Sequence, residues 1–321
     1  MYVGSCNGYF RRLDATTGKV QWETNVRDGA AKQYFFHGDV FIAPDRIVAS
    51  ADVDTKTGAE AGIHAFDAAS GRQLWKYSAG RGVLGAVAGS DSHVFAYTAT
   101  GDLIAVNLAS GKPEWTHALK AAVWESPAVT GERVVAGSSD GSVLAFDSRT
   151  GRVQWERKLG VPVATSMRAS ASDVYTATAD GTIHRLALTT GDVRSSLSID
   201  AVLKPTSVPV LVRDAVLVLL ADNEANYRAV VSLDSTLARV RWRRNAPDRW
   251  TTSRVFATPR AVFVGAPTGD VTAYCVADGT LAWSHKLANG PIRSIGGTDE
   301  RLLVGTPSGT LYALRPPRAC L

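Results

Sequence analysis

One motif recurs through the whole chain with a period of about 40 residues. Its reference position, directly after an alternating apolar segment, is Asp14, Asp67, Asn107, Asp147, Ala187, Asp234, Cys275 and Arg315 in successive copies. The spacing is nearly constant, except that it is longer after the first copy and after the fifth. A period of this length is typical of repeat folds, in which each copy is one small unit packed on the next. The repeat therefore limits the possible folds more than length or composition does.

Each copy reads as four short strands. In the fourth copy, an apolar segment at 126–130 precedes an apolar strand at 134–137, an alternating strand at 143–147 and a strand that contains Trp155. The segments are rich in β-branched residues and show no helical periodicity. Four antiparallel strands in each repeat of this length are the layout of a propeller blade. We predict an all-β fold, an eight-bladed β-propeller of four-stranded antiparallel blades, as a single domain over residues 1–321.

Glycine and tryptophan recur at two further positions of the repeat. The glycine position, four residues after the reference position, is Gly18, Gly71, Gly111, Gly151, Gly191, Ala238 and Gly279. The tryptophan position, eight residues after it, is Trp22, Trp75, Trp115, Trp155, Ser195, Trp242 and Trp283. Glycine supplies the positive φ that a tight hairpin needs, and a buried indole seals one blade against the next. Because Ser195 has no ring, we expect a weaker contact after the fifth blade, with faster hydrogen exchange there.

The pattern Ala-x-Asp-x-x-Thr-Gly-Lys-x-x-Trp, seen at residues 12–22 and 145–155, resembles the tryptophan-docking repeat of quinoprotein-like (PQQ-like) β-propellers. The resemblance covers essentially the whole chain and implies eight blades. WD40 repeats would need Gly-His and Trp-Asp pairs, and kelch repeats a double glycine, at fixed positions where this chain has neither. The minimal blades most resemble those of the non-catalytic outer-membrane assembly lipoproteins of Gram-negative bacteria. That resemblance implies a scaffold in the periplasm or cell envelope.

The first and last blades are expected to be incomplete. With blade strands lettered A to D from the axis outwards, the chain begins at strand B of blade one. It ends after strand C of blade eight, where Pro316 and Pro317 would interrupt a fourth strand. The missing strands correspond to about 20 residues upstream of Met1. We therefore expect an upstream segment, which would leave the export signal unknown, and open strand edges that favour self-association.

Composition and charge narrow the classes of partner. Hydrophobic residues make up 45% of the chain and charged residues 20%, as in globular proteins. The apolar run at 215–221 is too short to cross a bilayer, so we predict no membrane span. The net charge of +5 is spread over all repeats, so we predict no nucleic-acid binding.

The three cysteines, Cys6, Cys275 and Cys320, have no C-x-x-C spacing and indicate neither a zinc site nor a redox motif. A Cys275–Cys320 disulfide is conceivable, because both residues would follow the same strand in neighbouring blades. Of the two alternatives, we favour a pair of free thiols.

Two local motifs suggest chemistry that their position in the repeat argues against. Residues 137–141 match G-x-S-x-G, the nucleophile elbow of α/β-hydrolases, but they lie in a repeat hairpin rather than a strand-to-helix turn. Asp52, Asp54 and Glu60 are spaced like ligands of a calcium loop, but Lys56 occupies a ligand position. We interpret these segments as a turn and a polar surface loop. The histidines fall in different blades and are not expected to share a metal.

The resemblance raises the question of the PQQ cofactor. Quinoprotein dehydrogenases of this fold generally have adjacent cysteines in a vicinal disulfide, a calcium ion bound by Glu, Asn and Asp, a catalytic Asp, and long insertions. This chain has no Cys-Cys pair and keeps nearly every blade close to the minimal length. We therefore predict no cofactor, no metal and no catalytic residue. A degenerate PQQ-dependent dehydrogenase is one alternative, and a sensor or ligand-binding propeller of a larger protein is another.

The remaining candidates lie where the D-to-A and B-to-C loops gather. The predicted partner-binding residues are Trp124, Glu125, Arg168, Arg249, Trp250, Arg254 and Arg293. Tryptophan and arginine are the usual centres of protein interfaces, so this face is predicted to bind a protein partner. The alternative is that Trp124 and Trp250 plug the blade tops and the arginines are merely solvated. We predict a non-catalytic scaffold for protein–protein interaction, in cell-envelope protein assembly if the resemblance extends that far.

Overall fold

A computed structural model of the chain describes residues 1–5, 8–28, 32–36, 38–53, 62–80, 82–119, 126–200, 202–205, 207–222, 224, 227–250, 255–316 and 320. These residues form strands and turns, with no helix among them. The chain divides into two compact units, Met1–Ala171 and Ser172–Leu321, and each is described by itself.

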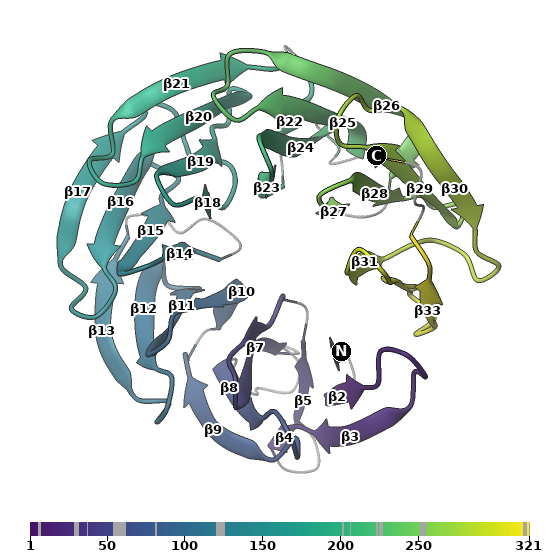
Figure 1. The fold of residues 1–321 in the computed structure, drawn as a ribbon. Helices are drawn as coiled ribbons and strands as arrows, with labels where there is room; N and C mark the ends of the chain where they lie inside the picture. The colour runs from purple at the N-terminus through teal and green to yellow at the C-terminus, as the bar shows by residue number, and fades with distance from the viewer. Residues whose placement is uncertain are drawn as a thin grey trace. The chain divides into compact units, whose positions relative to one another are not determined.

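The first unit contains four sheets and one strand, β18, of a fifth sheet. Its strands are β1 (Tyr2–Gly4), β2 (Tyr9–Leu13), β3 (Val20–Asn25), β4 (Arg27–Asp28), β5 (Lys32–Phe35), β6 (Phe41–Ile42), β7 (Arg46–Val53), β8 (Gly62–Asp67), β9 (Gln73–Ser78), β10 (Val83–Gly89), β11 (His93–Thr98), β12 (Asp102–Asn107), β13 (Pro113–Ala118), β14 (Ala128–Thr130), β15 (Arg133–Gly137), β16 (Ser142–Asp147), β17 (Val153–Lys158) and β18 (Arg168–Ala169). The sheet orders are β1-β2-β3, β4-β5-β7-β8-β9 with β6 on β7, β10-β11-β12-β13 and β14-β15-β16-β17. In Figure 1, the last strands β9, β13 and β17 lie on one side of these sheets and the first strands β10 and β14 on the other.

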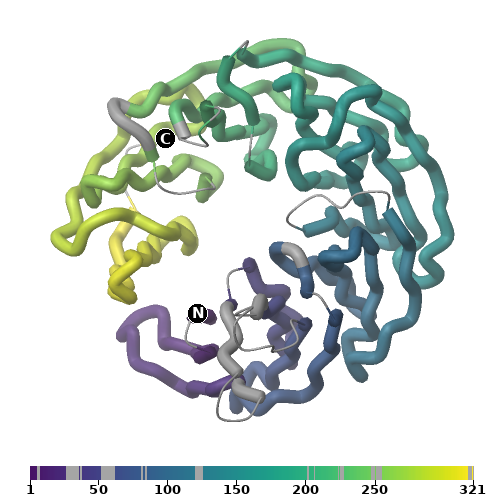
Figure 2. Tube along the Cα trace, turned by 180° about the vertical axis from the view of Figure 1, so that it is seen from behind, coloured from purple at the N-terminus to yellow at the C-terminus, as the bar shows by residue number. Residues whose placement is uncertain are grey.

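The second unit continues the same plan. Its strands are β19 (Asp173–Ala177), β20 (Thr182–Ala187), β21 (Val193–Ser198), β22 (Lys204–Pro205), β23 (Val210–Val212), β24 (Ala215–Ala221), β25 (Tyr227–Asp234), β26 (Val240–Trp250), β27 (Phe256–Ala257), β28 (Ala261–Gly265), β29 (Asp270–Cys275), β30 (Leu281–Lys286), β31 (Ser294–Gly297), β32 (Leu302–Gly305) and β33 (Leu311–Leu314). The sheet orders are β18-β19-β20-β21, β22-β24-β25-β26 with β23 on β24, β27-β28-β29-β30 and β31-β32-β33. Figure 2 shows the Cα trace of each unit from behind, with the sheets of each unit following one another in chain order.

These eight sheets are the blades of an eight-bladed all-β propeller, so the predicted fold class is confirmed. Among the described residues, four blades have four strands, the second and sixth have more, and the first and last have three, as the repeat predicted. The two longer spacings of the repeat fall in the blades with additional short strands, which are the second and the sixth. Burial follows the order of the strands: the second strand β11 is buried along its whole length, whereas the fourth strand β17 buries Trp155 and exposes most of its other residues.

The turn between the third and fourth strands is fixed by the reference residue. In the first blade, Asp14 Oδ1 accepts hydrogen bonds from the backbone N–H groups of Thr16 and Thr17, at 2.9 and 2.7 Å, and from the Thr17 hydroxyl at 2.9 Å. Gly18 follows with φ of 70°, a conformation that favours glycine. The same side-chain bonds recur at Asp67, Asn107 and Asp147. An Asp or Asn at this position therefore acts as the turn's own hydrogen-bond acceptor.

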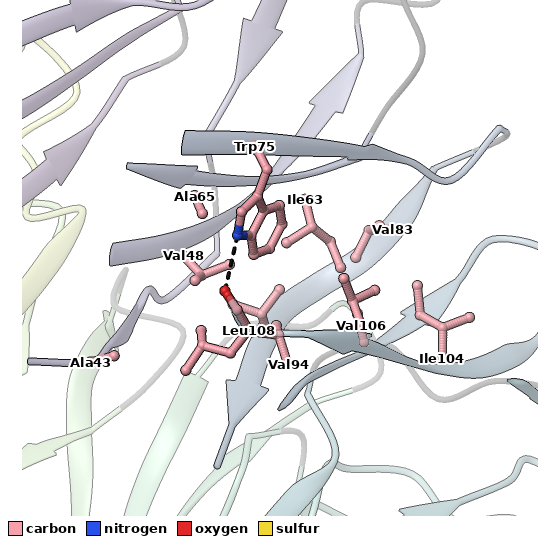
Figure 3. Packing of buried hydrophobic residues seen from close by; sticks show 12 residues of the cluster. Ala43, Val48, Ile63, Ala65, Trp75, Val83, Val94, Ile104, Val106 and Leu108 are labelled. Carbon is pink, nitrogen blue, oxygen red and sulfur yellow. Dashed lines mark hydrogen bonds between the residues drawn. The ribbon is translucent and has the colours of Figure 1, made fainter. Parts of the chain in front are cut away.

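The tryptophans join each blade to the next through a hydrogen bond as well as a ring. The indole N–H of Trp75 in β9 donates to the carbonyl oxygen of Leu108 in the third blade, at 2.9 Å, among buried residues that include Val48, Val94 and Val106 (Figure 3). Equivalent bonds run from Trp22 to Ala68, Trp115 to Ser148 and Trp242 to Val276, at 3.1, 3.1 and 2.8 Å. In each case the acceptor directly follows the reference residue of the next blade. We call such a contact between consecutive blades a seam.

Each of these rings packs on the glycine of the next blade's turn. A Cβ atom added at Gly111 would lie 2.6 Å from the Trp75 ring, and one at Gly71 would lie 2.5 Å from the Trp22 ring. The glycine is therefore required twice, for its positive φ and for the space that the indole fills. The sequence suggested the first requirement, and the structure adds the second.

The seam after the fifth blade is built differently. Ser195 stands in the tryptophan position, and its hydroxyl donates to the carbonyl oxygen of Thr236 at 2.6 Å. The carbonyl of Ser235, which is the usual acceptor, receives the hydroxyl of Tyr175 from β19 at 2.8 Å. Across this seam the turn has Ala238 in place of glycine, so the loss of the ring and the loss of the glycine coincide. Two hydroxyl hydrogen bonds thus replace the indole hydrogen bond of the other seams. Faster hydrogen exchange at this seam stays a prediction.

The cysteines differ from our expectation. Cys275, at the end of β29, and Cys320 form a disulfide across a sequence separation of 45 residues. Our preference for a pair of free thiols was therefore wrong. Both residues are buried in a cluster with Val304 and Ile292, where the C-terminal segment packs on the seventh blade. The repeat period could not show this, because Cys320 lies after the last repeated strand.

Candidate docking surfaces

Antiparallel pairing gives each blade two distinct ends. Turns between the first and second strands, and between the third and fourth, lie at one end, which we call the turn end. Turns between the second and third strands, and the connections between blades, lie at the other, which we call the loop end. The predicted partner-binding residues belong to the loop end.

Four of the seven predicted residues cannot be placed as side chains. Trp124, Glu125 and Arg254 lie outside the described residues, and so does the side chain of Arg249. Arg168 in β18 and Arg293, just before β31, have exposed side chains. The backbone N–H of Arg293 donates to the carbonyl oxygen of Gly305 at 2.8 Å, which fixes the start of the eighth blade. Both arginines are therefore accessible at the loop ends of their blades, and the backbone of each is described.

Trp250, at the end of β26, is buried. Its ring is 3% exposed and belongs to the apolar cluster that includes Leu219, Val255 and Val264 of the sixth and seventh blades. This is the position of a blade plug, the alternative that the sequence left open for this residue. An indole placed there offers little surface to a partner.

An ion pair joins the fifth and sixth blades at the loop end. Arg243 in β26 donates from its guanidinium to the carboxylate of Asp200, which follows β21. The other carboxylate oxygen accepts the backbone N–H groups of Val202 and Leu203, both at 2.8 Å. The bond from Arg243 is the main cause that lowers the pKa of Asp200 to about 2. The connection that follows β21 is thus held by a charged side chain that the repeat pattern did not identify.

The turn end has two cavities at equivalent places in the repeat. In the first unit, a cavity of about 620 Å³ lies between the second and third blades, lined by Phe41, Ile42, Pro44 and the turns at 89–92 and 107–109. In the second unit, a cavity of about 360 Å³ lies between the sixth and seventh blades. Arg213, Arg241 and Arg260 line this second cavity. The repeat pattern did not identify these arginines, two of which stand in the turns before β24 and β28.

Of the two motifs that suggested chemistry, the structure describes the G-x-S-x-G segment, and its role is structural. Residues 138–141 form the hairpin between β15 and β16, where Ser138 is buried and Gly141 has φ of 85°. Of the calcium candidates, Asp54, Glu60 and the side chain of Asp52 lie outside the described residues. No three His, Cys, Asp or Glu side chains gather as a metal site within the described ranges. Cys275 is bonded to Cys320, 45 residues away, and does not form the vicinal disulfide that quinoprotein dehydrogenases of this fold generally have.

The comparisons with known proteins agree with the fold. The family model described as outer membrane protein assembly factor BamB matches residues 59–222 and 179–318. The crystal structure of BamB from Moraxella catarrhalis is similar with a TM-score of 0.75 and 18% identity, covering 99% of this chain and 92% of that chain. The computationally designed Ika8 protein (TM-score 0.77, 15% identity) and the C-terminal WD40 domain of Sif2 (0.77, 13%) each cover 98% of this chain, and this chain covers 92% of each. At these identities the structural similarity shows the fold alone.

A comparison with curated proteins gave no match. Within the described ranges, no helix is long and apolar enough to cross a membrane.

Proposed function

Because the chain belongs to the family of the outer membrane protein assembly factor BamB, we propose that it is a non-catalytic scaffold in protein assembly at the cell envelope. The BamB-like propeller supports a scaffold role at the coarse level, since such a fold presents loops on rigid blades. The observation that carries the proposal is the family match over residues 59–222 and 179–318. The partner would bind at the loop end, where Arg168 and Arg293 are exposed.

The disulfide supports a place in the cell envelope. Disulfides form and persist in oxidising compartments such as the bacterial periplasm, and they are rare in the cytosol. Cys275 and Cys320 are bonded in this chain. The disulfide and the family match are independent observations, and both support a location in the cell envelope.

Charge reversal at the loop end tests the docking proposal. A partner captured from a cell-envelope fraction is identified and purified, and its affinity is measured for the wild type, Arg168→Glu and Arg293→Glu. We expect each reversal to weaken binding by roughly tenfold or more, as for arginines at the centre of an interface. Arg149→Glu, at the turn end of the fourth blade, is the matched control because Arg149 is also exposed. Equal affinities for all four proteins would overturn the loop end as the docking site.

Thermal unfolding with and without PQQ and Ca²⁺ tests the non-catalytic assignment. A ligand present at 100 times its Kd stabilises the native state by about 2.7 kcal/mol. We expect no shift in the melting temperature. An upward shift would contradict the scaffold assignment and would direct attention to alcohol and sugar substrates.

Self-association at the open sheet edges is part of the same proposal. The first and eighth sheets have three strands within the described residues, so β1 and β33 are edge strands there. Open edges are templates for pairing with a second chain. Leu311→Lys places a charge on β33, where Leu311 is 38% exposed, and should shift a self-associated sample toward monomer in analytical ultracentrifugation. A sample that is monomeric at all concentrations would remove self-association from the proposal.

A further inference from the structure

The cavity at the turn end of the sixth and seventh blades has a lining that its repeat position does not explain. The equivalent cavity between the second and third blades is lined by Phe41, Ile42 and Pro44 where the first and second strands meet, and by the ion pair of Asp45 with Arg46. Between the sixth and seventh blades, the same turns supply Arg213 and Arg260. Of the two cavities, only this one has more arginines than acidic residues in its lining, and the propeller repeat does not require that excess.

Arg213 occupies a backbone conformation that favours glycine. Its φ is 52°, in the two-residue turn that joins β23 to β24. In the fourth blade, the turn that joins β14 to β15 has Gly131 at the same place, with φ of 54°. A left-handed conformation is less favourable for an L-residue of this kind than for glycine. An arginine is thus held where the backbone alone would prefer glycine, and its side chain lines the cavity.

Both acidic side chains that line the cavity accept hydrogen bonds within the fold. Arg241 donates to both carboxylate oxygens of Asp214, and Asp278 accepts bonds from the backbone N–H and hydroxyl of Thr280 at 2.9 and 2.7 Å. Arg213 and Arg260 have exposed side chains, and no acidic side chain within the described residues lies at ion-pair distance from either. The cavity therefore has two guanidinium groups whose charge is not neutralised by a paired acid.

The wall of the cavity is rigid. Cys275, bonded to Cys320, lines it, and so does Val276, whose carbonyl oxygen holds the indole of Trp242 at 2.8 Å. Arg244 donates to the carbonyl oxygens of Gly279 and Asp278 in the same turn. A site on a fixed wall loses little entropy when it binds a ligand.

From this geometry we infer that the cavity lined by Arg213, Arg241 and Arg260 binds an oxyanion, a carboxylate or a phosphoryl group. Guanidinium groups match the planar or tetrahedral oxygens of such groups with charge-assisted hydrogen bonds. The volume of about 360 Å³ suits a small anion or one acidic side chain rather than a large cofactor. The site lies at the turn end, so it does not depend on the proposed docking surface at the loop end.

Isothermal titration calorimetry on the full chain tests the inference, with inorganic phosphate, glutarate and pentaglutamate as probes at matched ionic strength. We expect saturable 1:1 binding in the millimolar range or tighter. Arg213→Gly and Arg260→Gln should each weaken binding by about tenfold, the effect of losing one charge-assisted contact of about 1.4 kcal/mol. Arg149→Gln, an exposed arginine at the turn end of the fourth blade, should bind as the wild type does.

Arg213→Gly separates lost binding from lost folding. Because glycine accepts the φ of this turn, the variant should melt at the same temperature as the wild type or higher. Tighter binding of pentaglutamate than of glutarate would support a carboxylate carried by a peptide, and equal binding would support a free anion. Wild-type affinity in both cavity variants, or no saturable heat with any probe up to roughly 20 mM, would overturn the inference.

Discussion

A single serine in the sixth blade departs from the pattern of the repeat. Ser232 pairs with Trp242 across β25 and β26, where Ala65, Ala105 and Ala145 pair with the tryptophans of the second to fourth blades. Its hydroxyl is fully buried and has no hydrogen-bond partner within the described residues. A buried hydroxyl left unsatisfied costs roughly 1–3 kcal/mol.

We therefore expect Ser232→Ala to raise the free energy of unfolding by about 1 kcal/mol, measured by chemical denaturation. The matched control is Ser50→Ala in the second blade. Ser50 is also buried, but its hydroxyl donates to the carbonyl oxygen of Gly85 at 2.5 Å, so its removal should destabilise by a similar amount. If both changes destabilise the fold, the hydroxyl of Ser232 contributes favourably and the prediction is wrong.

The ion pair of Asp200 with Arg243 predicts a pH dependence. The folded pKa of Asp200 is about 2, below its usual 3.8, so the pair stabilises the fold above pH 4 and loses this contribution as the pH falls toward 2. Since the side chain of Arg243 is 35% exposed, we expect Asp200→Asn to cost only about 1 kcal/mol at neutral pH. The difference from wild type should vanish near pH 2.

Unfolding curves between pH 2 and 7 measure this effect. Asp45→Asn is the control, because the Asp45 carboxylate, which pairs with Arg46, is 65% exposed and is screened by solvent. A difference between Asp200→Asn and wild type that stays constant over this pH range would rule out the ion pair as its source.

At the scale of one element, two turn glycines allow the energetic cost of the positive φ to be measured separately from the cost of displacing a tryptophan ring. Gly111 has φ of 72° and lies under the Trp75 ring, whereas Gly18 has φ of 70° and no described atom within 4 Å of an added Cβ. Gly18→Ala should cost about 1 kcal/mol for the backbone alone. Gly111→Ala should cost about 1–3 kcal/mol more, since the ring must move. An equal loss of unfolding free energy in the two variants would show that packing of the Trp75 indole does not require a glycine at position 111.

The seam after the fifth blade tests whether hydroxyls can replace an indole. Tyr175→Phe removes the hydrogen bond to Ser235 and should cost about 1 kcal/mol, with faster hydrogen exchange at the third-to-fourth-strand turn of the sixth blade. Tyr274→Phe is the control, because the Tyr274 hydroxyl makes no hydrogen bond in the described part of the chain. Exchange that is no faster in wild-type blade five than in its neighbours would contradict our expectation of a weak seam there.

The strands and turns could be predicted from the sequence because their causes are local. The alternating segments, the acceptor at Asp14 and the positive φ of Gly18 all depend on residues a few positions apart. The contact of Gly111 with Trp75 could not be predicted, because the two residues belong to different blades. The repeat period fixes their spacing in the sequence, but it does not show which surfaces of neighbouring blades are in contact. The arginines of the turn-end cavity were missed for the same reason.

At the scale of the whole molecule, the C-terminal segment is tied to a blade that precedes it. The disulfide joins Cys275 and Cys320 across 45 residues, and in the chain-entropy model a loop of this size stabilises the fold by about 4 kcal/mol. Cys320 packs with Leu302, Val304 and Ile292 of the last blade, so the bond holds that blade's residues against the seventh. The last blade has only three described strands, and the covalent link compensates for the shorter sheet.

We expect Cys320→Ser, or reduction of the wild type, to lower the melting temperature by several degrees, since 1 kcal/mol corresponds to about 2–4 °C in a chain of this order of size. Cys6→Ser is the control: it should melt as the wild type does and still respond to reductant. Reductant should have no further effect on Cys320→Ser, because the bond is already absent. If hydrogen exchange in that variant rises first in β31 to β33, the disulfide acts by holding the last blade; a uniform rise across the chain would place its effect in the unfolded state instead.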